Sequence, residues 1–322
     1  MSSAAPLEVH TLLCHRDVPM AVRCLGSLLR YTHDPIGLVV HDDGTLKAED
    51  CGRLAELGPV RFVARPEADD QVFEALRRLP HCTRFRRQNV FGLKLFDVPL
   101  LATGDIAYCD SDILFLRPFR GLFAWLDPRT SLLLMRDAAN MYACTPRHLV
   151  LAPRFRLPAR CNAGLFFCRQ PAYDVDFIEW FLGLDLPRYR AAPTLVEQTA
   201  WAALGWRGGC RVWDPSQVAL VRRREQLTGE LVAGHFADDY GRQLLQSVAT
   251  REPGHSAPQV TVGTRPTRRL TGWCLAAERA KLRLDALRGR LRTNRGTPPP
   301  ASQRAVPLPS PAPSAPTTDR DG

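Results

Sequence analysis

Short apolar runs of strand length alternate with helical segments through the first 110 residues of the chain. The apolar runs cover residues 7–14, 36–41, 60–63 and 106–109, and helical segments are expected between them at 17–31, 70–79 and 89–102. Asp17 with Pro19 is typical of a helix start, and Pro80 is expected to stop the second helix. Strands and helices that alternate at this spacing predict an α/β fold with a mixed, mostly parallel sheet flanked by helices.

The rest of the chain continues this pattern less regularly. Strands are expected at 131–135, 164–168 and 211–213, and helices at 175–182 and 196–204. A basic amphipathic helix is expected over 265–295, because the apolar residues of 270–292 recur at helical spacing. This helix either packs on the rest of the chain or makes peripheral membrane contact through 268–292, where Trp273 suits an interface. Residues 296–322 are rich in Pro and Ser and predict a disordered tail.

The positive charge of the chain is concentrated near its C-terminus. The formal net charge is +10, and residues 265–295 carry ten basic and two acidic side chains. The remaining body is almost neutral, so we expect no nucleic-acid partner. No apolar run reaches the length of a membrane span, and the first residues lack the pattern of an export signal. The expected location is cytoplasmic, or peripheral at the inner face of the membrane.

Two aspartates directly follow the apolar run at 106–109. Asp110 and Asp112 flank Ser111 at the predicted carboxyl end of a buried strand, the edge at which open α/β sheets bind ligands. Two carboxylates placed there cost free energy unless a cation or N–H donors compensate them. Hard oxygen ligands suit Mn²⁺ or Mg²⁺, which also bind the oxygens of a substrate diphosphate. The other interpretation is a capped strand end in which both side chains accept hydrogen bonds from turn N–H groups.

Further polar motifs stand near other predicted strand ends or on predicted helices. They are Asp42-Asp43-Gly44, Lys94, Asn162-Ala163-Gly164, Glu197-Gln198 and Gly234-His235-Phe236. Together with Asp110-Ser111-Asp112, and in this order over about residues 7–240, they resemble the GT-A glycosyltransferases of the glycogenin-like and lipopolysaccharide galactosyltransferase-like groups. The resemblance implies a GT-A, Rossmann-like domain over 1–250. It also implies metal-dependent transfer of a hexosyl group from a nucleotide-diphospho-sugar, expected to be a UDP-sugar, to a glycan, lipid or protein acceptor.

The same resemblance assigns roles to individual residues. Asp110, Asp112 and His235 are expected to bind Mn²⁺ or Mg²⁺, which neutralises the leaving nucleoside diphosphate. The residues expected to contact the donor or substrate are Leu13, Cys14, Asp42, Lys94, Ser111, Asn162 and Gly164. Asp137 is expected to bond sugar hydroxyls. Glu197 and Gln198 are expected to stabilise positive charge at the anomeric carbon. The other interpretation of Glu197 is a general base for the acceptor hydroxyl.

The chain departs from the glycogenin-like pattern after His235. That group has a His-x-x-Gly-x-x-Lys segment whose lysine binds a phosphate, and Asp238 and Gly241 stand in place of its glycine and lysine. Residues 222–224, three arginines, are a candidate source of the missing positive charge. An ordinary core histidine is the other interpretation of His235.

Two other functions remain open at this point. One is a catalytically degenerate binding protein with a GT-A fold. The other is a phosphatase of the HAD type with Asp110 as nucleophile, although that class expects Thr or Val at the position of Leu114 and a motif near the N-terminus. The missing phosphate-binding lysine keeps the degenerate protein open as an alternative, whereas Leu114 and the position of the motif argue against the phosphatase.

Overall fold

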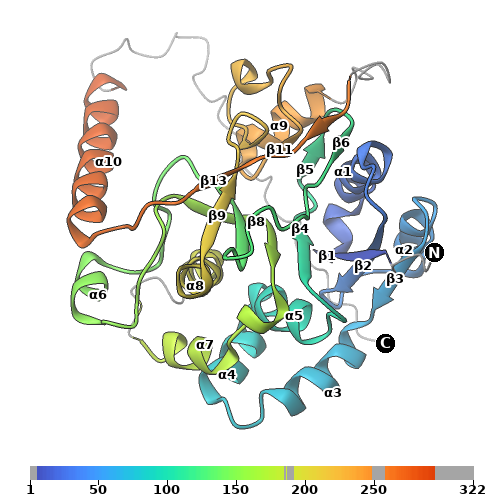
Figure 1. The fold of residues 1–322 in the computed structure, drawn as a ribbon, viewed down its shortest axis with the longest axis horizontal. Coiled ribbons are helices and arrows are strands. Elements are labelled where there is room, and N and C mark those ends of the chain that lie inside the picture. The colour runs from blue at the N-terminus through green and yellow to red at the C-terminus, as the bar shows by residue number, and fades with distance from the viewer. Residues whose placement is uncertain (1–5, 185, 187–191, 249–257, 294–322) are drawn as a thin grey trace, which may run out of the picture. The chain divides into compact units, whose positions relative to one another are not determined.

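The computed structural model describes residues 6–184, 186, 192–248 and 258–293 (Figure 1). The chain divides into two compact units, Met1–Glu278 and Arg279–Gly322, and the fold described below belongs to the first. Of the second unit, only the part that ends at residue 293 is described, and it is helical. The predicted tail at 296–322 lies outside the described residues.

Most of the described strands join in one mixed sheet. Its strands are β1 (Leu7–Leu13), β2 (Ile36–Asp42), β3 (Val60–Val63), β4 (Ile106–Cys109), β5 (Ile113–Phe115), β7 (Leu132–Arg136), β8 (Cys161–Cys168), β9 (Cys210–Trp213), β10 (Val218–Leu220), β11 (Ala233–His235) and β13 (Thr264–Pro266). The strand order is β3-β2-β1-β4-β8-β7-β10-β11-β5, with β9 paired to β7 and β13 paired to β9. Two further strands, β6 (Phe119–Arg120) and β12 (Val260–Thr261), pair with each other.

The pairing pattern confirms the predicted mixed, mostly parallel sheet. β3, β2, β1 and β4 are parallel neighbours, and β10 is parallel to both β7 and β11. β8 is antiparallel to its neighbours β4 and β7, and β5 is antiparallel to β11. Of the antiparallel strands, β8 is thus a neighbour of β4 and β5 follows the two aspartates, whereas β13 is antiparallel to β9 elsewhere in the sheet.

Helices connect and cover these strands. They are α1 (Val18–Tyr31), α2 (Ala48–Ala55), α3 (Arg65–Ala75), α4 (Pro80–Gln88), a π-helical segment η2 (Leu93–Asp97), α5 (Val98–Leu100), α6 (Pro146–Leu151), α7 (Val175–Leu182), α8 (Pro193–Gly208), α9 (Asp239–Val248) and α10 (Gly272–Thr293). Single-turn 3-10 segments lie at His15–Asp17, Gln170–Ala172 and Arg224–Gln226. In Figure 1, α4, α5, α7 and α8 lie on one side of the central strands, and α1 and α2 lie beside β1 and β2.

Side chains of β4 alternate between two hydrophobic clusters, as the period of a strand requires. Ile106 and Tyr108 belong to the cluster that includes α7 and α8, whereas Ala107 and Cys109 belong to the cluster that includes α1. Both faces of β4 are thus buried, so the chain leaves the core only at Asp110. All ten cysteines are free.

Several predicted helices have different bounds in the structure: the helix expected at 89–102 is η2 followed by α5, and the helix expected at 196–204 is the longer α8. The helix expected at 70–79 is α3, which begins at Arg65 and ends at Ala75. Pro80 does not stop that helix but begins α4, where its fixed backbone angle suits the first turn. The helix expected over 265–295 begins only at Gly272, because Thr264–Pro266 forms β13 and pairs with β9. None of the described helices has the length and hydrophobicity needed to cross a bilayer.

Candidate active site

The strand register brings distant polar segments to the carboxyl end of β4. β1 runs parallel to β4, so the residues after Leu13 lie on the same edge. β8 runs antiparallel to β4, and the N–H of Asp110 donates to the carbonyl oxygen of Gly164 at 2.7 Å. β11 runs antiparallel to β5, and the N–H of Phe236 donates to the carbonyl oxygen of Asp112 at 3.0 Å. The start of β8 and the end of β11 therefore face the two aspartates.

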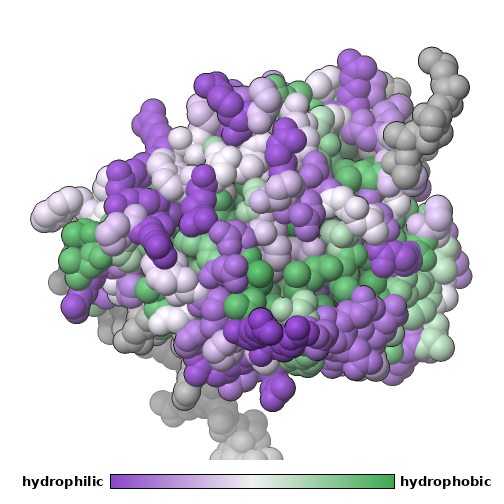
Figure 2. Space-filling view, turned by 60° about the horizontal axis from the view of Figure 1, so that its bottom comes forward, coloured by the Kyte–Doolittle hydropathy of each residue, from purple (hydrophilic) through white to green (hydrophobic). Residues whose placement is uncertain are grey.

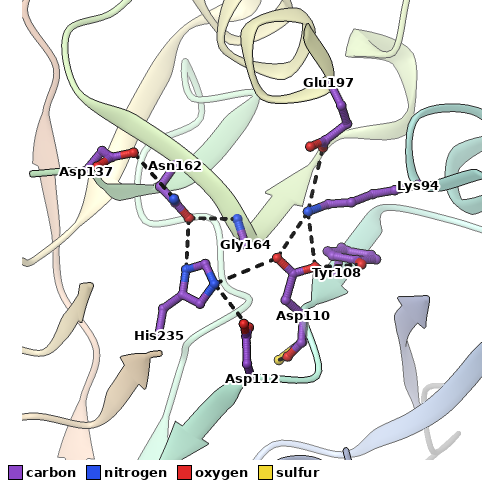
Figure 3. A network of polar contacts seen from close by, with 10 residues as sticks. Lys94, Tyr108, Asp110, Asp112, Asp137, Asn162, Gly164, Glu197 and His235 are labelled. Atoms are coloured by element: carbon purple, nitrogen blue, oxygen red, sulfur yellow. Dashed lines mark hydrogen bonds and ion pairs between the residues drawn. The ribbon is translucent and has the colours of Figure 1, made fainter. Parts of the chain in front are cut away.

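Asp110, Asp112 and His235 form a compact cluster at this edge (Figure 3). His235 Nε2 lies 3.1 Å from Asp112 Oδ1 and 3.9 Å from Asp110 Oδ2, and one ligand atom from each residue lies within 4.8 Å of the others. Asp112 and His235 are buried, whereas the Asp110 side chain is 29% exposed. Two carboxylate oxygens and one imidazole nitrogen, open on the side of Asp110, fit a divalent cation such as Mn²⁺.

The charges of this cluster favour each other. Burial lowers the pKa of His235, but the Asp112 and Asp110 carboxylates outweigh burial and raise it. Burial likewise raises the pKa of Asp112, but the neighbouring His235 outweighs burial and lowers it. The imidazole is therefore stabilised in its protonated form beside the carboxylates. Because a metal binds only neutral imidazole, metal binding at this cluster would release that proton.

Asn162 orients the His235 ring. His235 Nδ1 lies 3.1 Å from Asn162 Oδ1, which also accepts a hydrogen bond from the N–H of Gly164 at 2.9 Å. With Nδ1–H donating to this oxygen, Nε2 points toward Asp110 and Asp112 (Figure 3). A hydrogen bond of this kind fixes the orientation and the basicity of a metal-binding histidine. A Cβ at Gly164 would overlap the His235 ring, which explains why glycine stands there.

Lys94 joins the aspartates to a second buried carboxylate. It lies on η2, and its Nζ is 3.2 Å from Asp110 Oδ1 and 3.7 Å from Glu197 Oε1. The ammonium also lies over the Tyr108 ring, 4.4 Å from the centroid. Burial lowers the pKa of Lys94, but Asp110 and Glu197 outweigh burial and raise it. Lys94 is therefore a buried, charged ammonium at the wall of the site.

Glu197, on α8, titrates near neutrality. Burial raises its pKa to about 7, although the neighbouring Lys94 opposes this shift. Next to it, Gln198 Nε2 donates to the carbonyl oxygen of Met141 at 2.8 Å, which leaves the amide oxygen and the second N–H without another hydrogen bond among the described residues. Tyr108 donates its hydroxyl to Asp110 Oδ1 at 2.7 Å and fixes that carboxylate.

These groups line a cavity of about 770 Å³. A cavity of this size lies within the range of small-molecule sites. The predicted site residues that line it are Leu13, Cys14, Lys94, Asp110, Ser111, Asp112, Asn162, Gly164, Glu197, Gln198 and His235. The structure thus brings residues from β1, η2, β4, β8, α8 and β11 into one hollow.

Asp42 and Asp137 are the predicted site residues that do not line this cavity. Asp42 Oδ1 accepts hydrogen bonds from the N–H groups of residues 44–46, at 2.7 to 3.0 Å, and so holds the loop after β2. Asp137 is buried behind Asn162, whose Nδ2 lies 3.5 Å from Asp137 Oδ2. Asp42 therefore supports the loop that carries Asp43 and Thr45, and Asp137 supports Asn162, all of which line the cavity.

Several lining residues were missed by the sequence analysis, and the most informative is Arg242. It lies on α9 and lines the cavity, and its buried Nε has no hydrogen-bond partner among the described residues. The arginines at 222–224 do not line the cavity, and Arg222 is instead paired with Asp238 at 3.3 Å. Asp43 and Thr45 line the cavity where Asp42 was expected. Arg242 stands seven residues after His235 and directly follows Gly241, which replaces the phosphate-binding lysine, so its position in the sequence could have indicated a role in the site.

No protein-family model and no curated protein matches the chain. Among solved structures, it is similar to core-mannan synthase A of Aspergillus fumigatus in a Mn/GDP form, with 11% identity over 63% of this chain and 70% of that chain and a TM-score of 0.40. It is similar to the glycosyltransferase GlyE of Streptococcus pneumoniae, with 10% identity over 77% of this chain and 61% of that chain and a TM-score of 0.45. It is also similar to the galactosyltransferase LgtC in complex with donor and acceptor sugar analogues, with 12% identity over 76% of this chain and 95% of that chain and a TM-score of 0.44. These similarities are remote, so the geometry of the site itself has to carry a functional assignment.

Proposed function

We propose that the chain is a metal-dependent glycosyltransferase that uses a nucleotide-diphospho-sugar, with UDP as its nucleotide. One observation carries the proposal: Asp110, Asp112 and His235 place two carboxylates and an oriented imidazole at the edge of a cavity of about 770 Å³. Two cations line the same cavity, the buried Lys94 on η2 and the half-buried Arg242 on α9. Carboxylates with a divalent cation, flanked by fixed cations, are suited to a diphosphate rather than to a neutral ligand.

The diphosphate of the donor is proposed to lie between the metal cluster and Arg242. Asp110, Asp112 and His235 would hold a divalent cation, which would supply Lewis-acid stabilisation of a departing nucleoside diphosphate. Arg242 lines the cavity, so its guanidinium would be placed to bind a phosphate oxygen there. In this proposal Arg242 does the work of the phosphate-binding lysine that the sequence lacks after His235.

The nucleoside is proposed to occupy the end of the cavity formed by the loops after β1 and β2. Leu13 and Cys14 line this end with Asp43 and Thr45, and the Thr45 hydroxyl accepts a hydrogen bond from the N–H of His15 at 2.9 Å. Hydroxyls and a carboxylate at this end suit the polar edges of a base and a ribose. Asp42 contributes by holding the loop that carries Asp43 and Thr45.

The transferred sugar and its acceptor are proposed to lie against Asn162, Gly164, Glu197 and Gln198. The Gln198 amide oxygen and the Glu197 carboxylate can stabilise positive charge that develops at the anomeric carbon. A pKa of about 7 also suits Glu197 to accept a proton from an acceptor hydroxyl. Asp137 positions Asn162 from behind. The acceptor is proposed to be a glycan, a lipid or a protein, and an assay with each class identifies which.

Calorimetric titration of UDP into the protein, with and without Mn²⁺, tests the proposal. Wild type is expected to bind UDP in the presence of Mn²⁺, and the Asp110→Ala/Asp112→Ala variant is expected to lose this binding. The matched control is Asp70→Ala/Asp176→Ala, which removes two exposed carboxylates elsewhere and should bind as wild type does. Absence of binding by wild type to UDP, GDP and other nucleotides with metal present would overturn the proposal.

Hydrolysis of UDP-sugars in the presence of Mn²⁺ separates an enzyme from a degenerate binding protein. A transferase without its acceptor is expected to release UDP slowly from the correct donor, and the Asp110→Ala/Asp112→Ala variant should not. If wild type binds UDP with Mn²⁺ but turns over no sugar nucleotide in the presence of glycan, lipid or protein acceptors, the degenerate alternative replaces the transferase.

A further inference from the structure

Three of the large hydrophobic side chains in the described residues are more exposed than any other of their kind. They are Trp273 at 87%, Val150 at 66% and Leu151 at 62%. Val150 and Leu151 end α6, and Trp273 is in the first turn of α10. These helix ends are adjacent, because a Cβ at Gly272 would lie 3.1 Å from Val150 Cγ2. An exposed apolar patch of this kind usually marks an interaction surface.

The patch lies on two segments that are rich in arginine and contain no acidic residue. The segments 144–160 and 264–275, which carry the patch, contain no Asp or Glu. They run side by side, since the N–H of Leu270 donates to the carbonyl oxygen of Leu157 at 2.8 Å. Four arginines of these segments are exposed and have no ion-pair partner among the described residues: Arg147, Arg154, Arg268 and Arg269.

Among the described residues, the acidic groups that pair with arginines of these two segments pair with Arg160 and Arg265. Glu278 pairs with Arg160 at 3.5 Å, and Asp214 pairs with Arg265 at 2.8 Å. The four exposed arginines therefore keep their full charge toward the solvent. Figure 2 shows an isolated hydrophobic patch at its left margin with hydrophilic side chains around it, on the side where Figure 1 places α6.

We propose that this patch, Val150, Leu151 and Trp273 with the four arginines around it, docks on a membrane surface rich in anionic lipid. The three apolar side chains would enter the headgroup region, where Trp is favoured, while the guanidinium groups bind lipid phosphates. The charge of the rim is complementary to such a surface. A nucleic acid would use the arginines alone and leave exposed aliphatic side chains such as Val150 and Leu151 without a partner.

Co-sedimentation of the full chain with lipid vesicles tests this docking. Wild type is expected to bind vesicles that contain 30% phosphatidylserine and to bind pure phosphatidylcholine vesicles at least tenfold more weakly. Replacing the four arginines with Gln should weaken binding by about fivefold per arginine, because each basic residue near such a surface contributes on the order of 1 kcal/mol. The basic residues beyond 278 are unchanged in this variant, so any loss belongs to the patch.

A matched control removes the same amount of charge elsewhere. The variant Arg30→Gln/Arg53→Gln/Arg78→Gln/Arg84→Gln changes four exposed arginines outside the patch and should bind vesicles within twofold of wild type. Binding of the patch variant at the level of this control would overturn the proposal. So would tight binding of an RNA oligonucleotide together with failure to bind the anionic vesicles.

Trp273 supplies a second readout that a merely electrostatic attraction would not produce. The difference between the emission spectra of wild type and Trp273→Phe isolates this indole, and its emission should shift to shorter wavelength with anionic vesicles. The variant Val150→Ser/Leu151→Ser should bind at least tenfold more weakly and become more sensitive to salt. An unshifted Trp273 emission on bound protein would refute insertion and with it the proposal. All of these side chains are exposed, and circular dichroism checks that each variant is folded.

Discussion

The variant Glu197→Gln is expected to remove a pH dependence of stability that a single buried carboxyl creates. Glu197 has a pKa of about 7 in the folded chain against 4.5 when unperturbed, because burial disfavours its charged form. Between these two pH values the folded state binds more protons than the unfolded state, so stability falls as the pH rises. Integrated from pH 5 to 8.5, this single group costs about 2.5 kcal/mol of unfolding free energy. Gln has nearly the same shape and does not titrate.

Urea unfolding followed by circular dichroism measures this effect directly. Wild type and Glu197→Gln are compared at intervals from pH 5 to 8.5 with EDTA present, so that metal binding does not contribute. The free energy of unfolding of the variant minus that of wild type should rise by about 2.5 kcal/mol across this range, with the steepest change below pH 7. Glu67→Gln, at an exposed position on α3, is the control, and its difference from wild type should stay constant.

A difference between Glu197→Gln and wild type that stays constant within about 0.5 kcal/mol from pH 5 to 8.5 would refute the reasoning. It would mean that Lys94, 3.7 Å away, compensates burial fully and keeps Glu197 ionised at all these pH values. The variant Lys94→Met then provides a check. Without the ammonium, burial would act alone, and the pKa of Glu197 should rise further.

Three other predictions concern the metal cluster and the donor. Gly164→Ala should lower Mn²⁺ affinity at least tenfold in calorimetry, because the added methyl overlaps the ring of His235; unchanged affinity would show that the ring moves freely. Asn162→Ala should weaken Mn²⁺ binding by 10- to 100-fold, the usual effect of removing the group that orients a metal ligand, and its failure to do so would contradict the role of the Nδ1 contact. Arg242→Gln should weaken UDP binding about tenfold at saturating Mn²⁺ and leave Mn²⁺ binding within twofold, whereas Arg222→Gln should change neither; equal losses in both arginine variants would point to general electrostatics.

Much of the fold followed from sequence because strand faces and helix starts leave local signals. The run at 106–109 is apolar on both faces and is β4, and Asp17 with Pro19 marks the start of α1. Pro80 shows the limit of such signals. A proline after a helical pattern can end one helix or begin another, and tertiary packing of α4 against α7 settles it. The π-helical turns that carry Lys94 have no local signal.

The site was predictable where a motif directly follows a strand. It was not predictable where a side chain can either form hydrogen bonds within its own loop or line the cavity. Asp110 and Asp112 leave β4 directly, so their place at the sheet edge follows from the strand. Asp42 and Asp43 are neighbours in a turn, and only the three backbone N–H groups around Asp42 decide that Asp43 faces the cavity. Arg242 reaches the site from a helix that starts after the last strand of the motif series, so its position depends on how α9 packs.

The charges around the cavity argue that metal and nucleotide bind as a pair. Without a metal, His235 and Lys94 neutralise Asp110 and Asp112 through direct contacts, whereas the Nε of Arg242, which also lines the cavity, has no hydrogen-bond partner among the described residues. A diphosphate that enters alone would face two carboxylates at close range, which is unfavourable in a site of low dielectric. A divalent cation on the carboxylates reverses that field and supplies the positive charge that the diphosphate requires. The affinity for Mn²⁺ should therefore rise in the presence of UDP, and the affinity for UDP should rise by the same factor in the presence of Mn²⁺, as linkage demands. The fixed charges of Lys94 and Arg242 do not by themselves link the two affinities in this way.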